Sequence, residues 1–156
     1  MAICAQKLHR TIEISRKLAD KVGTPLLYLI IRLFMAQIFF QSGWLKFQNL
    51  LNGDWASTVD QFEYLYPVPG VPSPIAAVFG TAGELGLSIL LALGLIGRFA
   101  ALGLIGMTCV IQFLVPAEYG VSNPDHYYWI LLFSVILFRG AGTLSLDHLL
   151  LRWLYR

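Results

Sequence analysis

The sequence predicts an all-α integral membrane protein, an up-down bundle of four transmembrane helices with amphipathic helices at both ends of the chain. Of its 156 residues, 57% are hydrophobic and only 13% are charged, whereas a soluble domain carries about a quarter charged residues. One membrane domain is expected over residues 24–150, between an N-terminal segment 1–23 and a C-terminal helix 146–156. Its four apolar segments, each a candidate membrane span, cover about residues 24–47, 73–95, 98–115 and 124–139.

Residues 1–23 predict a basic amphipathic helix. Five basic residues outnumber two acidic ones, so the segment has a net charge of +3. Such a helix suits the surface of an anionic inner leaflet, although a solvated basic tail that only sets the topology fits the same pattern. On a helical wheel, one side of the segment contains Leu8, Ile12, Ser15, Leu18, Ala19 and Val22.

The first span is expected to start at the Thr-Pro pair 24–25, because proline is favourable at the first position of a helix. Arg32 then lies about 12 Å inside the membrane at ~1.5 Å per residue, on the same helix face as Lys46. A charge at that depth needs a partner, and we expect Arg32 to contact Glu84. Lys46 comes near the far surface, where it could snorkel instead. A second polar stripe contains Gln37, Gln41 and Trp44.

The second span carries Glu84 in its middle, about 16 Å from Ser73 at ~1.5 Å per residue. Ionisable groups at such a depth mark functional sites by default. A structural ion pair, or a protonated acid that fills a polar gap, is the alternative for Glu84. The glycines around it predict close packing between helices; they are Gly80, Gly83, Gly86 and Gly94.

The longest loop, residues 48–72, predicts a short interfacial helix that Asp54 could cap. The proline-rich run 66–74 follows and cannot be a continuous helix. It could roof a cavity between the spans or act as a rigid connector. After the fourth span, Ser145 is expected to cap a last amphipathic helix that lies on the membrane surface.

The basic residues predict the orientation of the chain. Nine of them fall on the side that holds both termini, whereas the loops of the other side carry five acidic residues and no basic one. By the positive-inside rule, both termini are expected to be cytoplasmic, in a multi-pass protein of a bacterial-type inner membrane.

Cysteine and histidine offer no pattern of a redox or metal centre. Cys4 and Cys109 are far apart and form no CxxC motif, so neither a disulfide nor a thiol relay within the chain is expected. His126 and His148 fall at opposite membrane faces, and with His9 they make a poor haem set. No metal site, covalently bound cofactor or nucleic-acid partner is expected.

Three motifs together resemble the DoxX family of small four-helix membrane proteins. They are Arg32 followed by Gly43-x-x-Lys46, Glu84 followed by a leucine-rich run to Gly94 and Arg98, and an ending close to G-x-G-x-x-S-x-D at residues 140–147. The resemblance covers about residues 24–150. It implies a bundle that passes electrons to the quinone pool or anchors a protein that does. Relatives include small subunits of thiosulfate:quinone oxidoreductase-type complexes and membrane partners of soluble thiol-stress enzymes.

Three functions remain open on this basis. In the first, the chain is an accessory or quinone-interacting subunit of a membrane oxidoreductase. Its pocket would be formed by Arg32, Gln41, Lys46 and Glu84, with Glu84 as a candidate proton relay, because a quinone head group needs hydrogen-bond donors beside a protonatable group in an apolar slot. Nothing in the chain carries an electron, so the redox chemistry must come from quinone or from a soluble or membrane partner.

In the second, the chain is a non-catalytic membrane anchor or assembly partner of a soluble enzyme. In the third, it is a small proton-coupled transporter, since it combines four short spans with one buried glutamate. All three involve the lipid bilayer, and a homo-oligomer is compatible with each of them.

Overall fold

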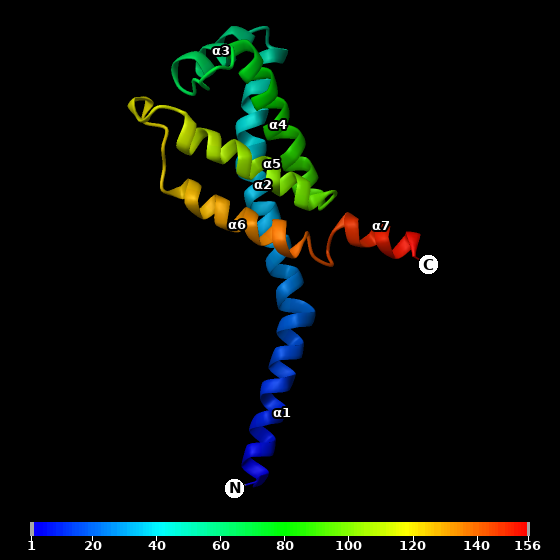
Figure 1. The fold of residues 1–156 in the computed structure, drawn as a ribbon. Coiled ribbons are helices and arrows are strands. Elements are labelled where there is room, and N and C mark those ends of the chain that lie inside the picture. The colour runs from blue at the N-terminus through cyan, green and yellow to red at the C-terminus, as the bar shows by residue number, and fades with distance from the viewer. Residues whose placement is uncertain (1, 156) are drawn as a thin grey trace.

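The computed structural model describes residues 2–155, with side chains from residue 9 onward, and is entirely helical in its regular structure over that range (Figure 1). The all-α prediction is therefore confirmed. The seven α-helices are α1 (Ala2–Leu18), α2 (Thr24–Leu51), α3 (Trp55–Tyr64), α4 (Ser73–Leu93), α5 (Gly97–Cys109), α6 (Asp125–Arg139) and α7 (Leu146–Leu154). Three short turns join them, the π-helical η1 (Ala19–Gly23) and η2 (Val110–Leu114) and the 3-10 turn η3 (Ala117–Tyr119).

Three stretches of the described chain are long and apolar enough to cross a membrane. They lie within His9–Leu51, Ser73–Leu93 and Gly97–Leu114. The expected fourth span corresponds to α6, which has 15 residues and is therefore about 22 Å long at ~1.5 Å per residue. That is shorter than a hydrocarbon core of about 30 Å, so the fourth span stays a prediction.

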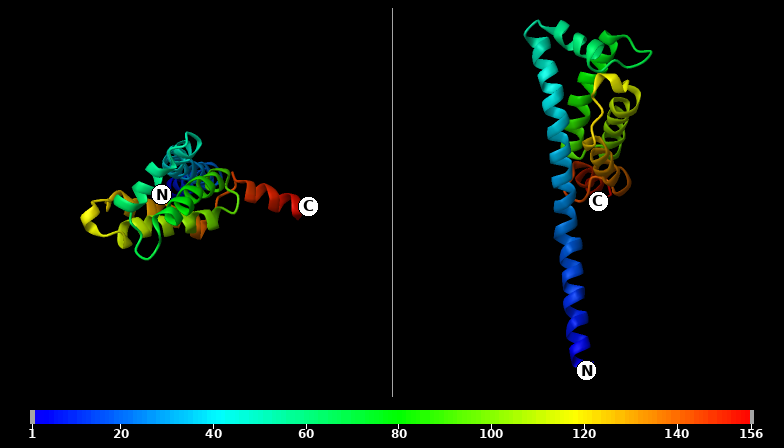
Figure 2. Two further views of the ribbon diagram at one scale, coloured as in Figure 1. Left: turned by 90° about the horizontal axis from the view of Figure 1, so that it is seen from above. Right: turned by 90° about the vertical axis from the view of Figure 1, so that its left-hand side faces the viewer.

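The chain is already helical where the first span was expected to start. Gly23, which precedes α2, has the helical angles φ −63° and ψ −49°, and η1 joins α1 directly to α2. A wider π turn at this place is understandable, because Pro25 lacks an N–H and its ring crowds the carbonyl four residues earlier. Figure 2 shows α1 extending beyond the bundle along the axis of α2. A position of α1 on the membrane surface would need a bend at η1 and stays a prediction.

Helices α2 and α4 form the most extensive contact of the bundle, and α5 packs on α4 and α6 (Figure 1). A glycine makes the first contact close: a Cβ atom at Gly43 would lie 2.9 Å from Glu84 Cβ. Where α2, α4, α5 and α6 meet, a buried apolar core forms around Met35, Phe39, Leu91, Leu104, Phe133 and Ile136.

The two ends of the bundle differ. At one end, which we call the α3 end, α3 packs across α4, and the Phe62 ring lies over Gly80. Asp54, the expected cap of α3, accepts a 2.7 Å hydrogen bond from Ser57 Oγ and makes no capping bond to the backbone. The opposite end, which we call the α7 end, is where α4 ends and α7 begins (Figure 1).

The capping role of Ser145 is confirmed at the α7 end. Its Oγ accepts a 3.3 Å hydrogen bond from His148 N, as expected of a serine that precedes a helix. Helix α7 points away from the bundle, across the direction of α2 (Figure 1), and none of its described side chains is buried. The predicted surface position of this helix fits that arrangement.

Candidate functional site

Lys46 and Glu84 form a buried ion pair between α2 and α4. Lys46 Nζ donates to Glu84 Oε2 at 2.7 Å and to Oε1 at 2.9 Å, and it also donates to Ser42 Oγ at 2.7 Å. The two charged side chains are only 7% and 9% exposed. Since an ammonium group has three N–H donors, every donor of Lys46 has a partner. Lys46 therefore does not snorkel to the surface but turns into the bundle.

The prediction that Arg32 contacts Glu84 is wrong. The guanidinium of Arg32 donates instead to backbone carbonyls, those of Ala141 at 2.6 Å, Leu144 at 3.0 Å and Ala92 at 3.2 Å. These carbonyls belong to the last turn of α4 and to the segment after α6. The terminal carbonyls of a helix lack partners within it, and the planar fork of arginine can satisfy several at once.

Arg32 and Glu84 do not meet because Lys46, the partner of Glu84, comes 14 residues after Arg32 on α2, about 21 Å further along the helix at ~1.5 Å per residue. Thr24 is eight residues before Arg32 in the same continuous helix, about 12 Å along its axis at ~1.5 Å per residue. Arg32 itself contacts the segments at the α7 end. Arg32 therefore holds one end of the bundle together, away from the Lys46–Glu84 pair.

The closing motif of the sequence builds the same end of the bundle. Asp147 accepts hydrogen bonds from Ile96 N at 2.8 Å and Gly97 N at 3.0 Å, and its own N–H donates to Gly94 O at 3.0 Å. Ser145 Oγ donates to Gly142 O at 2.6 Å. The motif thus fastens the α4–α5 turn to the start of α7, which is a structural role.

Gln41 also lies outside the predicted pocket. It is exposed, whereas Lys46, five residues further along α2, is buried. Five residues correspond to about 140° around a helix, so the two side chains leave α2 on nearly opposite sides. Of the four predicted pocket residues, the structure brings together only Lys46 and Glu84.

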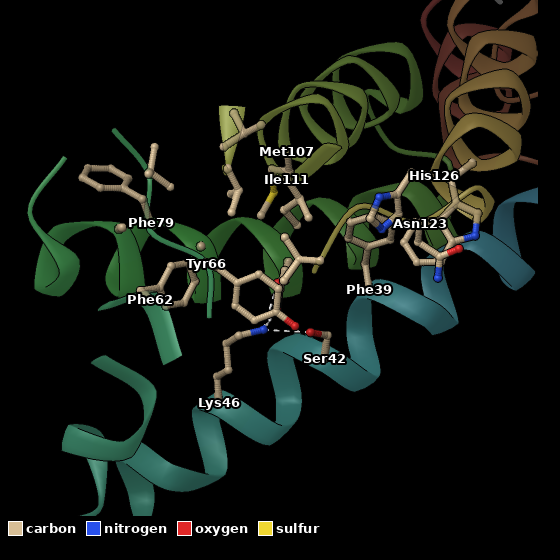
Figure 3. Close-up of a pocket in the computed structure, with 18 of the residues that line it drawn as sticks. Phe39, Ser42, Lys46, Phe62, Tyr66, Phe79, Met107, Ile111, Asn123 and His126 are labelled. Carbon is tan, nitrogen blue, oxygen red and sulfur yellow. Dashed lines mark hydrogen bonds and ion pairs between the residues drawn. The ribbon is translucent and has the colours of Figure 1, made fainter. Parts of the chain in front are cut away.

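A cavity of about 610 Å³ adjoins the ion pair (Figure 3). Its volume is in the range of about 300–1,000 Å³ that small-molecule sites occupy. Apolar side chains from α2 to α6 form most of its wall, among them Ile38, Phe39, Phe62, Phe79, Met107, Ile111 and Trp129. Polar side chains also line it, namely Ser42, Lys46, Tyr66, Glu84, Asn123 and His126.

The proline-rich segment between α3 and α4 contributes to this cavity. Tyr66, Val68 and Val71 line it, and Figure 3 shows the Tyr66 ring beside Lys46 and Ser42. Of the two alternatives for this segment, a cavity roof describes the structure better than a connector alone.

His126 is a cavity residue that sequence reasoning missed. Its Nδ1 lies 2.7 Å from Gln112 Oε1, and its ring centroid is 4.9 Å from that of Trp129. Because an amide oxygen only accepts hydrogen bonds, a neutral His126 carries its proton on Nδ1 and leaves Nε2 as an acceptor. The signal was present in the sequence, since Gln112 ends one predicted span and His126 begins the next on the same membrane side.

The described residues contain no group of three or more histidine, cysteine or acidic side chains that could hold a metal ion. Cys109 is a free, partly exposed thiol in α5. The side chain of Cys4 lies outside the described part of the chain.

Comparison with known proteins gives two findings. The family model described as DoxX matches residues 27–117, a range that includes Lys46 and Glu84. A protein of Haemophilus influenzae described as "Uncharacterized protein" is 30% identical over 134 residues, which cover 83% of this chain and 86% of the relative. No solved structure matches the chain.

Proposed function

The chain belongs to the DoxX family, and from that premise we propose that it is an accessory, quinone-interacting subunit of a membrane redox system. The observation that carries the proposal is a buried ion pair, Lys46–Glu84, in the wall of a largely apolar cavity. With it we propose four spans, α6 being the fourth, in a bacterial-type inner membrane with both termini cytoplasmic. The charge asymmetry of the loops supports this orientation.

The residues that line the cavity fit a quinone head group. Apolar and aromatic walls suit its ring, and hydrogen-bonding groups occur at two places, with Lys46 and Glu84 from α2 and α4 and His126 from α6. A bound quinone would take up two electrons and two protons when it is reduced, and the quinol would release them when it is oxidised. Lys46 can donate a hydrogen bond to a carbonyl by releasing Ser42. In quinol oxidation His126 Nε2 and the Glu84 carboxylate can each accept a proton, and in the reverse direction the same two groups, once protonated, can return them.

Electrons must reach such a site from outside this chain. No group of metal ligands exists among the described residues, and the side chains named above move protons only. A redox partner, soluble or membrane-bound, is therefore part of the proposal.

Titration of the purified protein in lipid nanodiscs with short-chain benzoquinone and naphthoquinone analogues, followed by calorimetry, tests this function. The decisive variant is Ile111→Phe, which places a larger side chain in the wall of the cavity and leaves the ion pair intact. Its matched control is Leu102→Phe, because Leu102 lies on the neighbouring helix α5 with 51% of its surface exposed. We expect saturable binding that weakens at least tenfold in Ile111→Phe and in Glu84→Gln but not in Leu102→Phe. Absence of binding to folded wild type, or equal binding to Ile111→Phe, would refute the proposal.

A second candidate function is supported by a different observation. Helix α1 extends beyond the bundle as a continuation of α2 (Figure 2), and residues 1–23 are basic. That arrangement suits a membrane anchor for a soluble enzyme with an acidic surface. An anchor should co-purify with the same soluble protein in wild type and in Glu84→Gln, and should lose it when Arg16 and Lys17 become Glu.

A further inference from the structure

One side of α2 presents an unbroken exposed stripe with heptad spacing. The buried residues of α2 share the opposite side; they are Arg32, Met35, Ala36, Phe39, Gly43 and Lys46. The exposed stripe, which we call the α2 seam, alternates steps of three and four residues. It consists of Leu27, Ile30, Phe34, Gln37, Gln41, Trp44, Gln48 and Leu51. This spacing is the pattern by which two helices pack in a left-handed coiled coil.

Two carboxamides of the α2 seam lie about midway along the part of α2 between Arg32 and its last residue. Arg32 contacts the α7 end of the bundle, and α2 ends at Leu51. Gln41 comes nine residues after Arg32 and ten residues before Leu51, so it lies about 14 Å from each of them at ~1.5 Å per residue. That is roughly halfway across a hydrocarbon core of about 30 Å. Gln37 lies one turn away.

Lipid chains cannot satisfy these two side chains. Both are exposed, and neither has a side-chain hydrogen bond to another described residue of the chain. A carboxamide has two donors and one acceptor oxygen, and polar groups in the hydrocarbon region find their partners on neighbouring helices. The α2 seam therefore lacks an occupant that can form hydrogen bonds.

We propose that a second copy of this chain covers the α2 seam, giving a two-fold dimer in which parallel α2 helices pair Gln37 and Gln41 with their counterparts. Two copies insert into a membrane with the same orientation, so a two-fold axis along the membrane normal brings each residue opposite itself. A carboxamide is complementary to another carboxamide, because each donates to the oxygen of the other. The dimer leaves the Lys46–Glu84 cavity on the far side of α2, so the proposal does not depend on the proposed function.

The stripe continues past the membrane segment into α1. Ile12, Ala19 and Val22 are exposed and fit the same alternation, except that five residues separate Val22 from Leu27. The π turn η1 lies at this place, and a π turn takes up one extra residue per turn. The apolar stripe of α1 thus stays on the side of the α2 seam, as a parallel pair of long helices requires.

Cysteine cross-linking in native membranes tests the dimer. In a background with Cys4→Ala and Cys109→Ala, we compare Gln37→Cys and Gln41→Cys with Leu131→Cys, a control on α6 where the native side chain is 63% exposed. We expect a disulfide-linked species of twice the monomer mass for both seam variants and little for the control. Equal cross-linking at residue 131, or linkage of the seam only to a protein of different mass, would overturn the proposal.

A second measurement tests the proposed hydrogen bonds between the Gln37 and Gln41 side chains of the two copies. Dimerisation is followed by fluorescence transfer between labelled copies in liposomes at decreasing protein-to-lipid ratio. The double variant Gln37→Leu/Gln41→Leu is expected to raise the dimer dissociation constant at least tenfold, whereas Gln37→Asn/Gln41→Asn, which keeps both carboxamides, retains more of the affinity. A protein that stays monomeric at every ratio, or an unchanged dissociation constant in the leucine variant, would contradict it.

Discussion

Lys46 Nζ lies 2.7 Å from Glu84 Oε2 inside the bundle, and this contact joins two helices through residues 38 positions apart. Removing one member of a buried ion pair leaves the other charge uncompensated, which costs about 3–5 kcal/mol, whereas replacing both with apolar groups can be nearly neutral. We therefore expect Lys46→Met and Glu84→Leu each to destabilise the protein by several kcal/mol.

The double variant Lys46→Met/Glu84→Leu should recover most of that loss, although it should not bind the quinone analogues. Denaturant unfolding in mild detergent measures the three free energies of unfolding. Purely additive effects of the two substitutions would show that the pair is not energetically coupled.

For Arg32 we expect a contribution to stability and no role in ligand binding. Its guanidinium reaches carbonyls on two separate segments, a geometry that a lysine ammonium cannot reproduce. Arg32→Lys should therefore lower the free energy of unfolding by about 2–3 kcal/mol, the loss expected when charge-assisted hydrogen bonds are removed and buried carbonyls are left unpaired.

The affinity of folded Arg32→Lys protein for quinone analogues should stay within about twofold of wild type, because Arg32 does not line the cavity. A selective loss of binding with unchanged stability would show that Arg32 takes part in ligand binding after all.

The sequence was sufficient to predict the α-helical class, the family, the cap at Ser145 and the buried position of Glu84. These follow from local rules, such as hydropathy, capping chemistry and helix periodicity. The capping rule did not hold everywhere, because Asp54 accepts a hydrogen bond from Ser57 Oγ and caps no backbone N–H of α3. The partner of Glu84 did not follow, because it depends on where each helix enters the bundle. Counting residues from Thr24 gave Arg32 and Glu84 similar depths, whereas Arg32 contacts the α7 end of the bundle and Glu84 pairs with Lys46, 14 residues further along α2.

His126 and Gln41 are two further residues whose surroundings the sequence alone could not predict. Each has a clear position along its helix, but neither the rotation of α2 nor the approach of α6 to the cavity can be read from one sequence. The structure turns Gln41 away from the ion pair and brings His126 into the wall of the cavity that the ion pair also lines.

Substitution of Gly43 tests how closely α2 and α4 pack. A Cβ atom there would lie 2.9 Å from Glu84 Cβ and 3.0 Å from Leu85 N, so α2 and α4 would have to separate. Gly43→Ala should destabilise the protein by about 1–3 kcal/mol, as overpacking in a closely packed interior does. Gly86→Ala is the matched control on α4, because no atom lies within 4 Å of a Cβ atom at Gly86.

Thermal unfolding of both glycine variants, with folding checked by circular dichroism, provides the comparison. We expect Gly86→Ala to be neutral or slightly stabilising, since alanine favours helix over glycine. Equal stability of Gly43→Ala and Gly86→Ala would mean that the two helices pack less closely than the structure indicates.

Asp147 holds Ile96 in an unusual backbone conformation. Ile96 has φ 50° and ψ 40°, a left-handed region that β-branched residues seldom adopt, and its N–H donates to Asp147. Asp147→Ala removes the acceptor of two backbone N–H groups and should destabilise the protein by about 1–3 kcal/mol. Its control is Leu149→Ala, at an exposed position of the same helix.

Adding Ile96→Gly to Asp147→Ala should restore part of the loss, because glycine adopts positive φ without steric cost, and the side chain given up is 56% exposed. Hydrogen exchange at the amides of residues 96 and 97 measures the local effect, which should be faster exchange in Asp147→Ala and unchanged exchange in Leu149→Ala. If exchange at these amides is the same in Asp147→Ala as in wild type, the carboxylate does not fasten the α4–α5 turn to α7.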